Sequence, residues 1–221
     1  WDGDILLAYG LIGLICWRLI RDAPSVKSLF NTGVLLYLVG VGVLLLLGVI
    51  SGRETSRAWT PDASALLYEK YWKINGGMEA VSNRVDMMSN SLLALGAQYG
   101  WQLAGMMLLG AALMRSGWLK GQYSLQHYRR TGVLLVILGM AINLPAIVAQ
   151  WHLDWAYRWC AFLLQAPREL GAPLQTIGYA ALMFGFWPQL SRLKWVIAIA
   201  CVGRMALTNY LLQTLICTTL F

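Results

Sequence analysis

The chain has 221 residues, of which 58% are hydrophobic and 12% are charged, and its formal net charge is +7. Soluble domains carry about 25% charged residues, so this composition excludes a water-soluble globular protein and indicates that lipid solvates the chain. The positive charge does not predict a nucleic-acid partner, because the cytoplasmic loops of membrane proteins carry an excess of Lys and Arg. The composition therefore predicts an all-α, polytopic transmembrane helical bundle.

Six segments are long and apolar enough, or nearly so, to cross a bilayer. A span needs about 20 mostly apolar residues, and the first and fifth segments are at the short end of that range. The predicted spans cover residues 4–20, 32–51, 92–114, 131–150, 170–187 and 195–221. Together they predict a single transmembrane domain over residues 1–221. Because the chain starts at Trp1 and ends in an apolar run without a polar flank, we expect this domain to be truncated at both ends.

The charge of the loops alternates along the chain. Loops 18–31, 115–130 and 188–194 have an excess of basic residues, whereas loops 52–91 and 151–169 balance their charges. Basic loops stay in the cytoplasm of a membrane protein. Residue 1 and the two balanced loops are therefore predicted to lie outside, and the three basic loops inside.

The outer loop 52–91 is predicted to be a periplasmic amphipathic helical insertion. Residues 60–62 (Thr-Pro-Asp) have the pattern of an N-cap, a proline at the first helical position and an acid in the first turn. Apolar residues follow at helical spacing, so we expect a short helix on the membrane surface that ends at the glycine pair 76–77. A second polar helix should lead into span three. The other outer loop, 151–169, is rich in tryptophan, which predicts anchoring at the lipid headgroups rather than a substrate cage.

Arg204 is the main candidate for a substrate-binding residue. It lies ten residues after Lys194, which places it about 15 Å into a hydrocarbon core of about 30 Å. A charge at that depth needs a partner, yet predicted spans two to five contain no Asp or Glu. The partner is therefore an acid outside this sequence, backbone carbonyls, or a bound anion, since a guanidinium group suits phosphate and carboxylate.

Further polar residues extend this candidate site. Thr208, Asn209 and Gln213 follow Arg204 toward the predicted outer face. Each one alone is best explained as an interhelical hydrogen bond, but together they predict a helix that faces a cavity.

Spans three and four carry weaker cavity candidates. Gln98 and Gln102 are four residues apart, so they share one face of span three. Asn143 lies just before a proline that should kink span four.

The catalytic candidates are Asp4, Asp2 and His152. The two aspartates form an acidic rim at the outer mouth of span one, where Asp4 alone is explained as a helix N-cap. His152 lies at the outer end of span four without a partner by spacing, so contact with headgroups explains it better. A histidine general base would have to be His152 or lie outside this sequence. The four cysteines are scattered singly, without a CxxC or Cys/His cluster, so no metal site is predicted.

Two stretches, WDGDILLAYGLIGL at residues 1–14 and GRMALTNYLLQTLI at 203–216, resemble the YeiB-like family of bacterial inner-membrane proteins, a group defined by a domain of unknown function. The resemblance extends along the whole chain and includes RAWTPDASALLYEKYW at 57–72. It implies a bacterial inner-membrane location and further helices on both sides, with a His-Gly pair upstream of Trp1. The positions that match the family pattern are Gly3, Asp4, Ile5, Leu6, Tyr9, Gly203, Arg204, Thr208, Asn209, Tyr210 and Gln213. Tyr9 joins the substrate-binding candidates on this basis.

This family is remotely similar to multi-span membrane acyltransferases, which move an acyl group from a cytoplasmic thioester to an outer-face acceptor. The resemblance implies an acyl-CoA donor at the basic loops, a small-molecule, lipid or glycan acceptor, and the upstream histidine as base, with no bound cofactor. Two other functions stay open. A permease for an anionic solute predicts broken helices and an inverted repeat. A non-catalytic scaffold predicts that replacing Arg204 only destabilises the protein.

Overall fold

A computed structural model describes residues 6–51 and 62–220, and every regular element in these residues is a helix. The prediction of an all-α fold is therefore confirmed. Two short segments, η2 and η4, are π-helices, and η3 is a 3₁₀-helix. The elements in chain order are α1 (Leu6–Asp22), α2 (Val26–Ile50), α3 (Ala63–Asn75), α4 (Gly77–Ala94), η2 (Leu95–Tyr99), α5 (Gly100–Arg115), η3 (Trp118–Lys120), α6 (Leu125–His152), η4 (Trp159–Leu163), α7 (Gln165–Gly185), α8 (Trp187–Leu190), α9 (Lys194–Arg204) and α10 (Ala206–Leu220).

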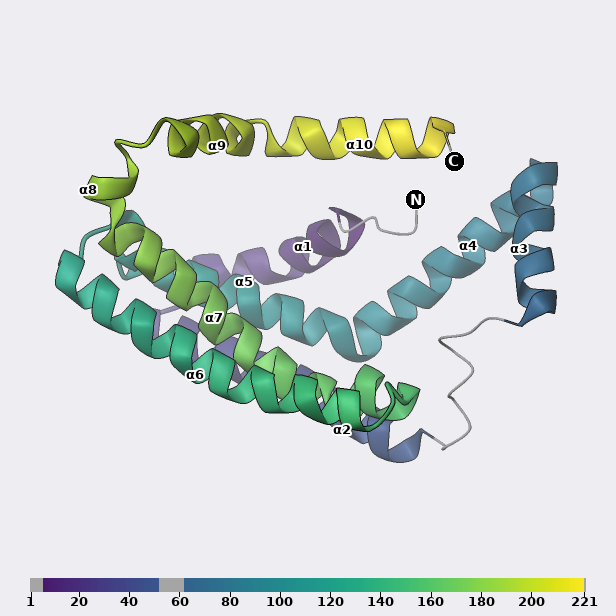
Figure 1. The fold of residues 1–221 in the computed structure, drawn as a ribbon, viewed down its shortest axis with the longest axis horizontal. Helices are drawn as coiled ribbons and strands as arrows, with labels where there is room; N and C mark the ends of the chain where they lie inside the picture. The colour runs from purple at the N-terminus through teal and green to yellow at the C-terminus, as the bar shows by residue number, and fades with distance from the viewer. Residues whose placement is uncertain (1–5, 52–61, 221) are drawn as a thin grey trace.

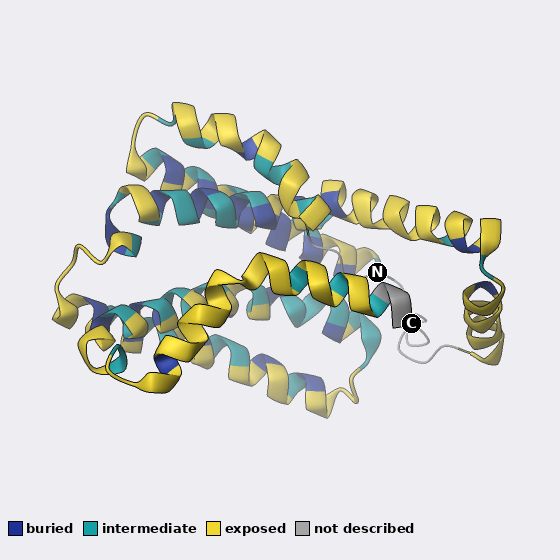
Figure 2. Ribbon diagram, turned by 90° about the horizontal axis from the view of Figure 1, so that it is seen from above, coloured by how far each residue is buried: buried dark blue, intermediate teal, exposed yellow. Residues whose placement is uncertain are grey.

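Two closely packed helix pairs form the bundle (Figure 1). α2 packs along α5, α6 packs along α7, and contacts of α2 with η4 and α7 join the two pairs. Small residues allow this approach. A Cβ on Gly105 would lie 2.7 Å from the carbonyl oxygen of Gly33, and one on Gly178 would lie 2.9 Å from the backbone nitrogen of Val136. Buried residues concentrate in the paired helices, whereas α3, α4, α9 and α10 are mostly exposed (Figure 2).

The described residues of all six predicted spans are mostly helical, but only three of the described helices are long and apolar enough to cross a membrane on their own. These are α2, α6 and the continuous helix formed by α4, η2 and α5 over Gly77–Arg115. α9 and α10 would together make a fourth span with a bend of 65°. The helices are thus compatible with a membrane protein, and the count of six spans stays a prediction.

The prediction of one uninterrupted helix over residues 195–221 is wrong. α9 ends at Arg204, and Met205 separates it from α10. Gly203 weakens the helix at this point, because glycine in a helix interior costs about 1 kcal/mol relative to alanine. Arg204 in the last turn of α9 also suits the negative end of the helix dipole. The break separates Arg204 from Thr208, so the predicted polar track does not run along one straight helix.

The described part of the insertion between α2 and α5, residues 62–91, is helical, and its first helix begins after the predicted cap. Residues 60 and 61 of the predicted cap lie outside the described residues, and the observed N-cap of α3 is Asp62. Gly76 ends α3 at a φ of 61°, which glycine adopts without a steric penalty. α4 then begins at Gly77 and extends the helix of η2 and α5 away from the paired helices (Figure 1).

Candidate functional site

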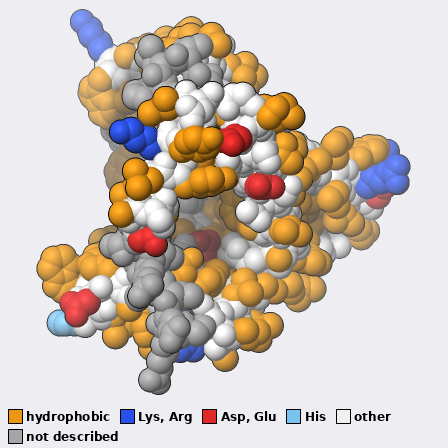
Figure 3. Space-filling model, turned by 90° about the vertical axis from the view of Figure 1, so that its right-hand side faces the viewer, with side chains coloured by type: hydrophobic (Ala, Val, Ile, Leu, Met, Phe, Trp, Pro, Cys, Tyr) orange, Lys and Arg blue, Asp and Glu red, His pale blue; other side chains and the backbone are white. Residues whose placement is uncertain are grey.

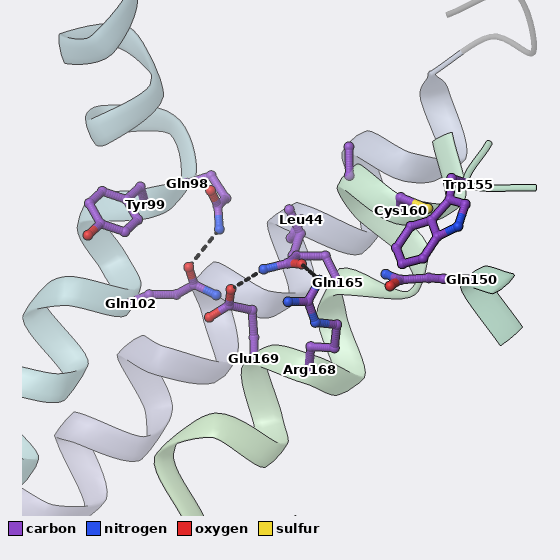
Figure 4. Close-up of a pocket in the computed structure, with 11 residues that line it drawn as sticks. Leu44, Gln98, Tyr99, Gln102, Gln150, Trp155, Cys160, Gln165, Arg168 and Glu169 are labelled. Carbon is purple, nitrogen blue, oxygen red and sulfur yellow. Dashed lines mark hydrogen bonds between the residues drawn. The ribbon is translucent and has the colours of Figure 1, made fainter. Parts of the chain in front are cut away.

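A cavity of about 420 Å³ lies where α2, η2, α5, the end of α6, η4 and α7 meet. We call it the amide pocket, because four glutamine side chains contribute to its wall. Figure 4 shows those of η2 and α5 on one side, opposite Glu169 and its neighbours on α7. The end of the molecule nearest α3 is hollowed, and carboxylates lie around this hollow (Figure 3). The lining residues are Leu44, Gln98, Tyr99, Gln102, Gln150, Trp155, Cys160, Ala161, Gln165, Arg168 and Glu169.

Two amides in this pocket are buried without a full set of hydrogen bonds. Gln102 is 5% exposed, and its Oε1 accepts from Gln98 Nε2 at 2.8 Å, but its own Nε2 has no partner. Gln150 is 2% exposed, and its Nε2 also has no partner among the described residues. An unsatisfied buried donor costs about 1–3 kcal/mol, so such groups call for an explanation. Both residues line one cavity, although the two nitrogen atoms themselves have almost no accessible surface.

Glu169 is the carboxylate of the amide pocket, and α7 holds it in a short hydrogen-bond chain. Arg168 Nη1 donates to Gln165 Oε1 at 3.2 Å, and Gln165 Nε2 donates to Glu169 Oε1 at 2.6 Å. Tyr37 Oη lies 3.2 Å from Glu169 Oε2. Hydrogen bonds to charged groups are stronger than neutral ones, so these donors fix the direction of the carboxylate.

A proline explains why Tyr37 reaches the backbone of α7. Pro173 has no N–H group, so it cannot bond to the carbonyl of Glu169 four residues earlier. Tyr37 Oη donates to this carbonyl at 2.6 Å instead. Tyr37 is buried on α2, so one side chain satisfies the free carbonyl and also contacts the carboxylate of the same residue.

Both π-helices of the described chain contribute to the wall of the amide pocket. Gln98 and Tyr99 come from η2, and Cys160 and Ala161 come from η4. π-Helical turns are rare, occur mostly as single turns, and are frequent at functional sites. Their convergence on one cavity therefore supports its choice as the candidate site.

The turn after α6 places an aromatic ring at the same cavity. Asp154 and Trp155 both have positive φ values, of 48° and 56°. Such values are uncommon for residues other than glycine and cost free energy, so the surrounding structure must impose them. The backbone N–H of Trp155 donates to the Gln150 carbonyl at 3.1 Å, which turns the chain back over the end of α6. Trp155 consequently lines the amide pocket, whereas Trp151 is 70% exposed.

A second cavity of about 220 Å³ adjoins the amide pocket. Three residues, Tyr99, Gln102 and Glu169, line both cavities. We call the second cavity the tyrosine chamber, because three tyrosines contribute to it. Its lining residues are Tyr9, Tyr37, Tyr99, Gln102, Leu103, Met106, Glu169, Ala172, Pro173 and Thr176.

The structure brings some of the predicted site residues together. Gln98 and Gln102 line the amide pocket, and Tyr9 lines the tyrosine chamber beside Glu169. The other substrate-binding candidates line neither cavity and are exposed on α9 and α10. They are Arg204, Thr208, Asn209 and Gln213.

The catalytic candidates are more dispersed. Asp2 and Asp4 lie outside the described residues, and His152 is exposed as the last residue of α6 without lining the amide pocket. Asn143 Nδ2 donates to Gln175 Oε1 at 3.2 Å between α6 and α7, and it lines neither cavity. Among the described residues, no group of three or more His, Cys, Asp or Glu side chains could hold a metal ion.

The sequence analysis missed Glu169, Arg168 and Gln165, because it assigned them to an outer loop. α7 begins at Gln165, five residues before the predicted start of span five. One signal was available: a proline four residues after Glu169 predicts a free carbonyl at that residue.

Fold and site together define an all-α helical bundle that contains span-length apolar helices and a cavity with amide and charged side chains in its wall. The chain resembles proteins of the YeiB-like family along its whole length. It is 82% identical over its 221 residues to "Uncharacterized protein YeiB" of Escherichia coli (strain K12), of which it covers 57%. It is 27% identical over 234 residues to "Uncharacterized protein YxaH" of Bacillus subtilis (strain 168), of which it covers 54%.

The chain therefore spans a little over half the length of these relatives. Residues 113–221 match the family described as "Protein of unknown function (DUF418)". No solved structure matches the chain. The resemblance to this family that the sequence indicated is confirmed.

Proposed function

We propose that the chain forms the acceptor-binding part of a multi-pass inner-membrane acyltransferase, with a hydroxyl-bearing acceptor bound in the amide pocket. The observation that carries the proposal is the pair of buried amides, Gln102 and Gln150, whose Nε2 groups have no partner among the described residues. An amide offers both donors and acceptors, and a hydroxyl group needs both. Four amides around one cavity therefore suit a hydroxyl-rich molecule better than an anion.

In the proposed reaction the acceptor hydroxyl attacks the carbonyl carbon of an acyl thioester. A C–O bond forms, the C–S bond breaks, and the hydroxyl proton passes to the Glu169 carboxylate and then to the leaving thiolate. Each carboxylate oxygen has about two lone-pair sites, so Glu169 can accept a further proton donor besides Gln165 and Tyr37. A rotation of the buried Gln102 side chain would let its unbonded Nε2 donate to the oxyanion of the tetrahedral intermediate.

The donor in this proposal is an acyl-CoA that approaches from the cytoplasmic side, where the basic loops 18–31, 115–130 and 188–194 would meet its phosphates. Arg204 is exposed at the end of α9, and it makes no hydrogen bond or ion pair with another described residue. Its guanidinium group thus remains available to an anionic part of the donor. The insertion 52–91 and the 151–169 segment would lie on the outer side with the amide pocket.

A permease is the second candidate, because one observation favours it. α9 and α10 form a helix pair bent by 65° at Arg204, and transporters bind solutes at broken helices of this kind. In that case the solute would be anionic and would cross the membrane without chemical change.

The test uses the full-length protein in detergent, with acetyl-CoA as donor and methyl glucoside as a hydroxyl-rich acceptor. Release of free thiol reports acyl transfer. We expect Glu169→Gln to lower the rate by about 10²-fold or more, the usual contribution of a general base. Glu79→Gln on the exposed face of α4 is the matched control and should keep the rate of the wild type.

Equal rates in the wild type and Glu169→Gln would overturn the assignment of the proton acceptor. Absence of thiol release from a folded wild-type protein, together with uptake of an anionic solute into vesicles that Arg204→Gln abolishes, would establish the permease instead.

A further inference from the structure

The amide pocket and the tyrosine chamber lie at different depths along the same helices. On α2, Leu44 lines the amide pocket and Tyr37 lines the chamber, seven residues nearer the middle of the helix. At 1.5 Å per residue, this difference is about 10 Å along the helix axis. The chamber therefore lies deeper in the bundle than the pocket.

The lining residues of α5 and α7 also place the tyrosine chamber deeper than the amide pocket. On α5, Gln102 lines both cavities, and Met106, one turn further from the start of the helix, lines only the chamber. On α7, Gln165 lines only the amide pocket, and Thr176, about three turns further into the helix, lines only the chamber. Glu169 lies between them and lines both.

Apolar side chains form part of the chamber wall, beside the hydroxyl groups of Tyr9, Tyr37 and Thr176. Residues that line only the chamber include Leu103 and Met106 on α5 and Ala172 and Pro173 on α7. None of these four side chains carries a hydrogen-bonding group suited to a polyol. The chamber thus accommodates apolar atoms next to the amides of the pocket.

The chamber opens on the side of the bundle rather than at its end. Ala172 and Thr176 are exposed on α7, and Tyr9 on α1 is 44% exposed. Tyr37, in the wall of the chamber, lies near the middle of α2, which is a helix long and apolar enough to cross a membrane. The predicted topology would place this lateral opening at the depth of the hydrocarbon chains of the lipid.

We propose that the acceptor is a membrane amphiphile, with its hydroxyl-rich headgroup in the amide pocket and its hydrocarbon chain leaving the bundle through the tyrosine chamber. This inference rests on the proposed function, and it names the substrate class of that same site. Glu169 then meets the junction between headgroup and chain, since it lines both cavities.

The experiment measures binding of alkyl glucosides of increasing chain length to the full-length protein in nanodiscs. Isotopically labelled methyl and octyl glucoside are the two probes, and binding to empty nanodiscs is subtracted. Burial of one methylene group corresponds to about fourfold in affinity. We therefore expect octyl glucoside to bind the wild-type protein at least about tenfold more tightly than methyl glucoside, because several methylene groups enter the chamber.

Two variants test whether the alkyl chain of octyl glucoside binds in the tyrosine chamber. Thr176→Trp fills the chamber opening without touching the amide pocket, so it should abolish the gain from the octyl chain and leave binding of methyl glucoside unchanged. Met183→Trp is the matched control, because Met183 is exposed on α7 two turns beyond Thr176 and lines neither cavity. It should bind both probes as the wild type does.

Each outcome separates the two proposals. Equal affinity of the wild type for both probes would overturn the proposal that the acceptor is an amphiphile. It would leave the proposal of a hydroxyl-binding pocket intact. A chain-length gain that survives in Thr176→Trp would overturn the assignment to the tyrosine chamber. Failure of both probes to bind a folded wild-type protein would overturn the hydroxyl-binding pocket, and with it this inference.

Discussion

The Tyr37 hydroxyl on α2 donates to the backbone carbonyl of Glu169 on α7 at 2.6 Å, and it does so because Pro173 leaves that carbonyl without its helical partner. The two residues are 132 positions apart in the sequence. Their contact links the two helix pairs of the bundle next to the amide pocket.

Tyr37→Phe should lower the free energy of unfolding by about 1–3 kcal/mol, because a carbonyl in the bundle loses its donor. Tyr179→Phe, at an exposed tyrosine on α7, is the control and should change little. Thermal unfolding in detergent provides the measurement. Pro173→Ala restores an N–H group to α7 and should rescue part of the loss in the double variant. Strictly additive effects of the two substitutions would contradict this explanation.

Gln150→Met should change the free energy of unfolding by less than about 1 kcal/mol, because it removes a buried donor that is already unsatisfied. Gln165→Met is the comparison, since Gln165 donates to Glu169 and accepts from Arg168. That variant should lose about 1.5–3 kcal/mol, the usual contribution of hydrogen bonds to charged groups. Chemical denaturation of both variants tests the difference, and a larger loss in Gln150→Met would show that its amide is satisfied in the protein.

Gly105→Ala should destabilise the α2–α5 pair by about 1–3 kcal/mol, the usual cost of overpacking. The new Cβ would lie 2.7 Å from the Gly33 carbonyl oxygen and from the Tyr37 backbone nitrogen, and neither is a mobile side-chain atom. Gly110→Ala on the same helix has open space around its Cβ. It should be neutral or stabilise by up to about 1 kcal/mol through helix propensity. The midpoint of thermal unfolding should therefore fall in Gly105→Ala, whereas in Gly110→Ala it should stay unchanged or rise.

The start of α3 should depend on pH through Asp62. Hydrogen bonds from the Ser64 hydroxyl and the Ala65 N–H lower the pKa of this carboxyl group from its ordinary value. Because the pKa is lower in the folded helix than in the unfolded chain, the stabilisation is present above about pH 4 and is lost as the pH falls through the folded pKa.

Hydrogen exchange of the amides in residues 63–75 measures this loss. Asp62→Asn is the control, since asparagine caps helices without titrating in this range. Its exchange should keep the same protection down to low pH, and parallel loss of protection in both proteins would exclude Asp62 as the cause.

The parts of the site that sequence reasoning found depend on local spacing. Gln98 and Gln102 are one helical turn apart, so their shared face could be predicted, and their hydrogen bond follows from the same spacing. The fold class followed from composition, and the glycine pair 76–77 was predicted to end the first helix of the insertion, as Gly76 does.

The missed residues depend on contacts between distant segments. A hydropathy count treats Arg168 and Glu169 as the end of an apolar segment, so it placed them in a loop. In the structure Glu169 lies within α7, where Gln165 donates to its carboxylate and the distant Tyr37 donates to its backbone carbonyl. The only local indication of the helix break after Arg204 was Gly203. The apolar residues on both sides of it have the composition of one continuous span.

The helix formed by α4, η2 and α5 is 39 residues long and is continuous from Gly77 to Arg115. At 1.5 Å per residue it measures about 58 Å, whereas the hydrocarbon core of a bilayer is about 30 Å thick. The helix is therefore longer than one crossing requires, and it bends at η2, so that α4 and α5 run in different directions (Figure 1). Gln98 lies in η2 and Gln102 lies just after it, and both line the amide pocket. A change in the angle between α4 and α5 would therefore act directly on residues that line the amide pocket.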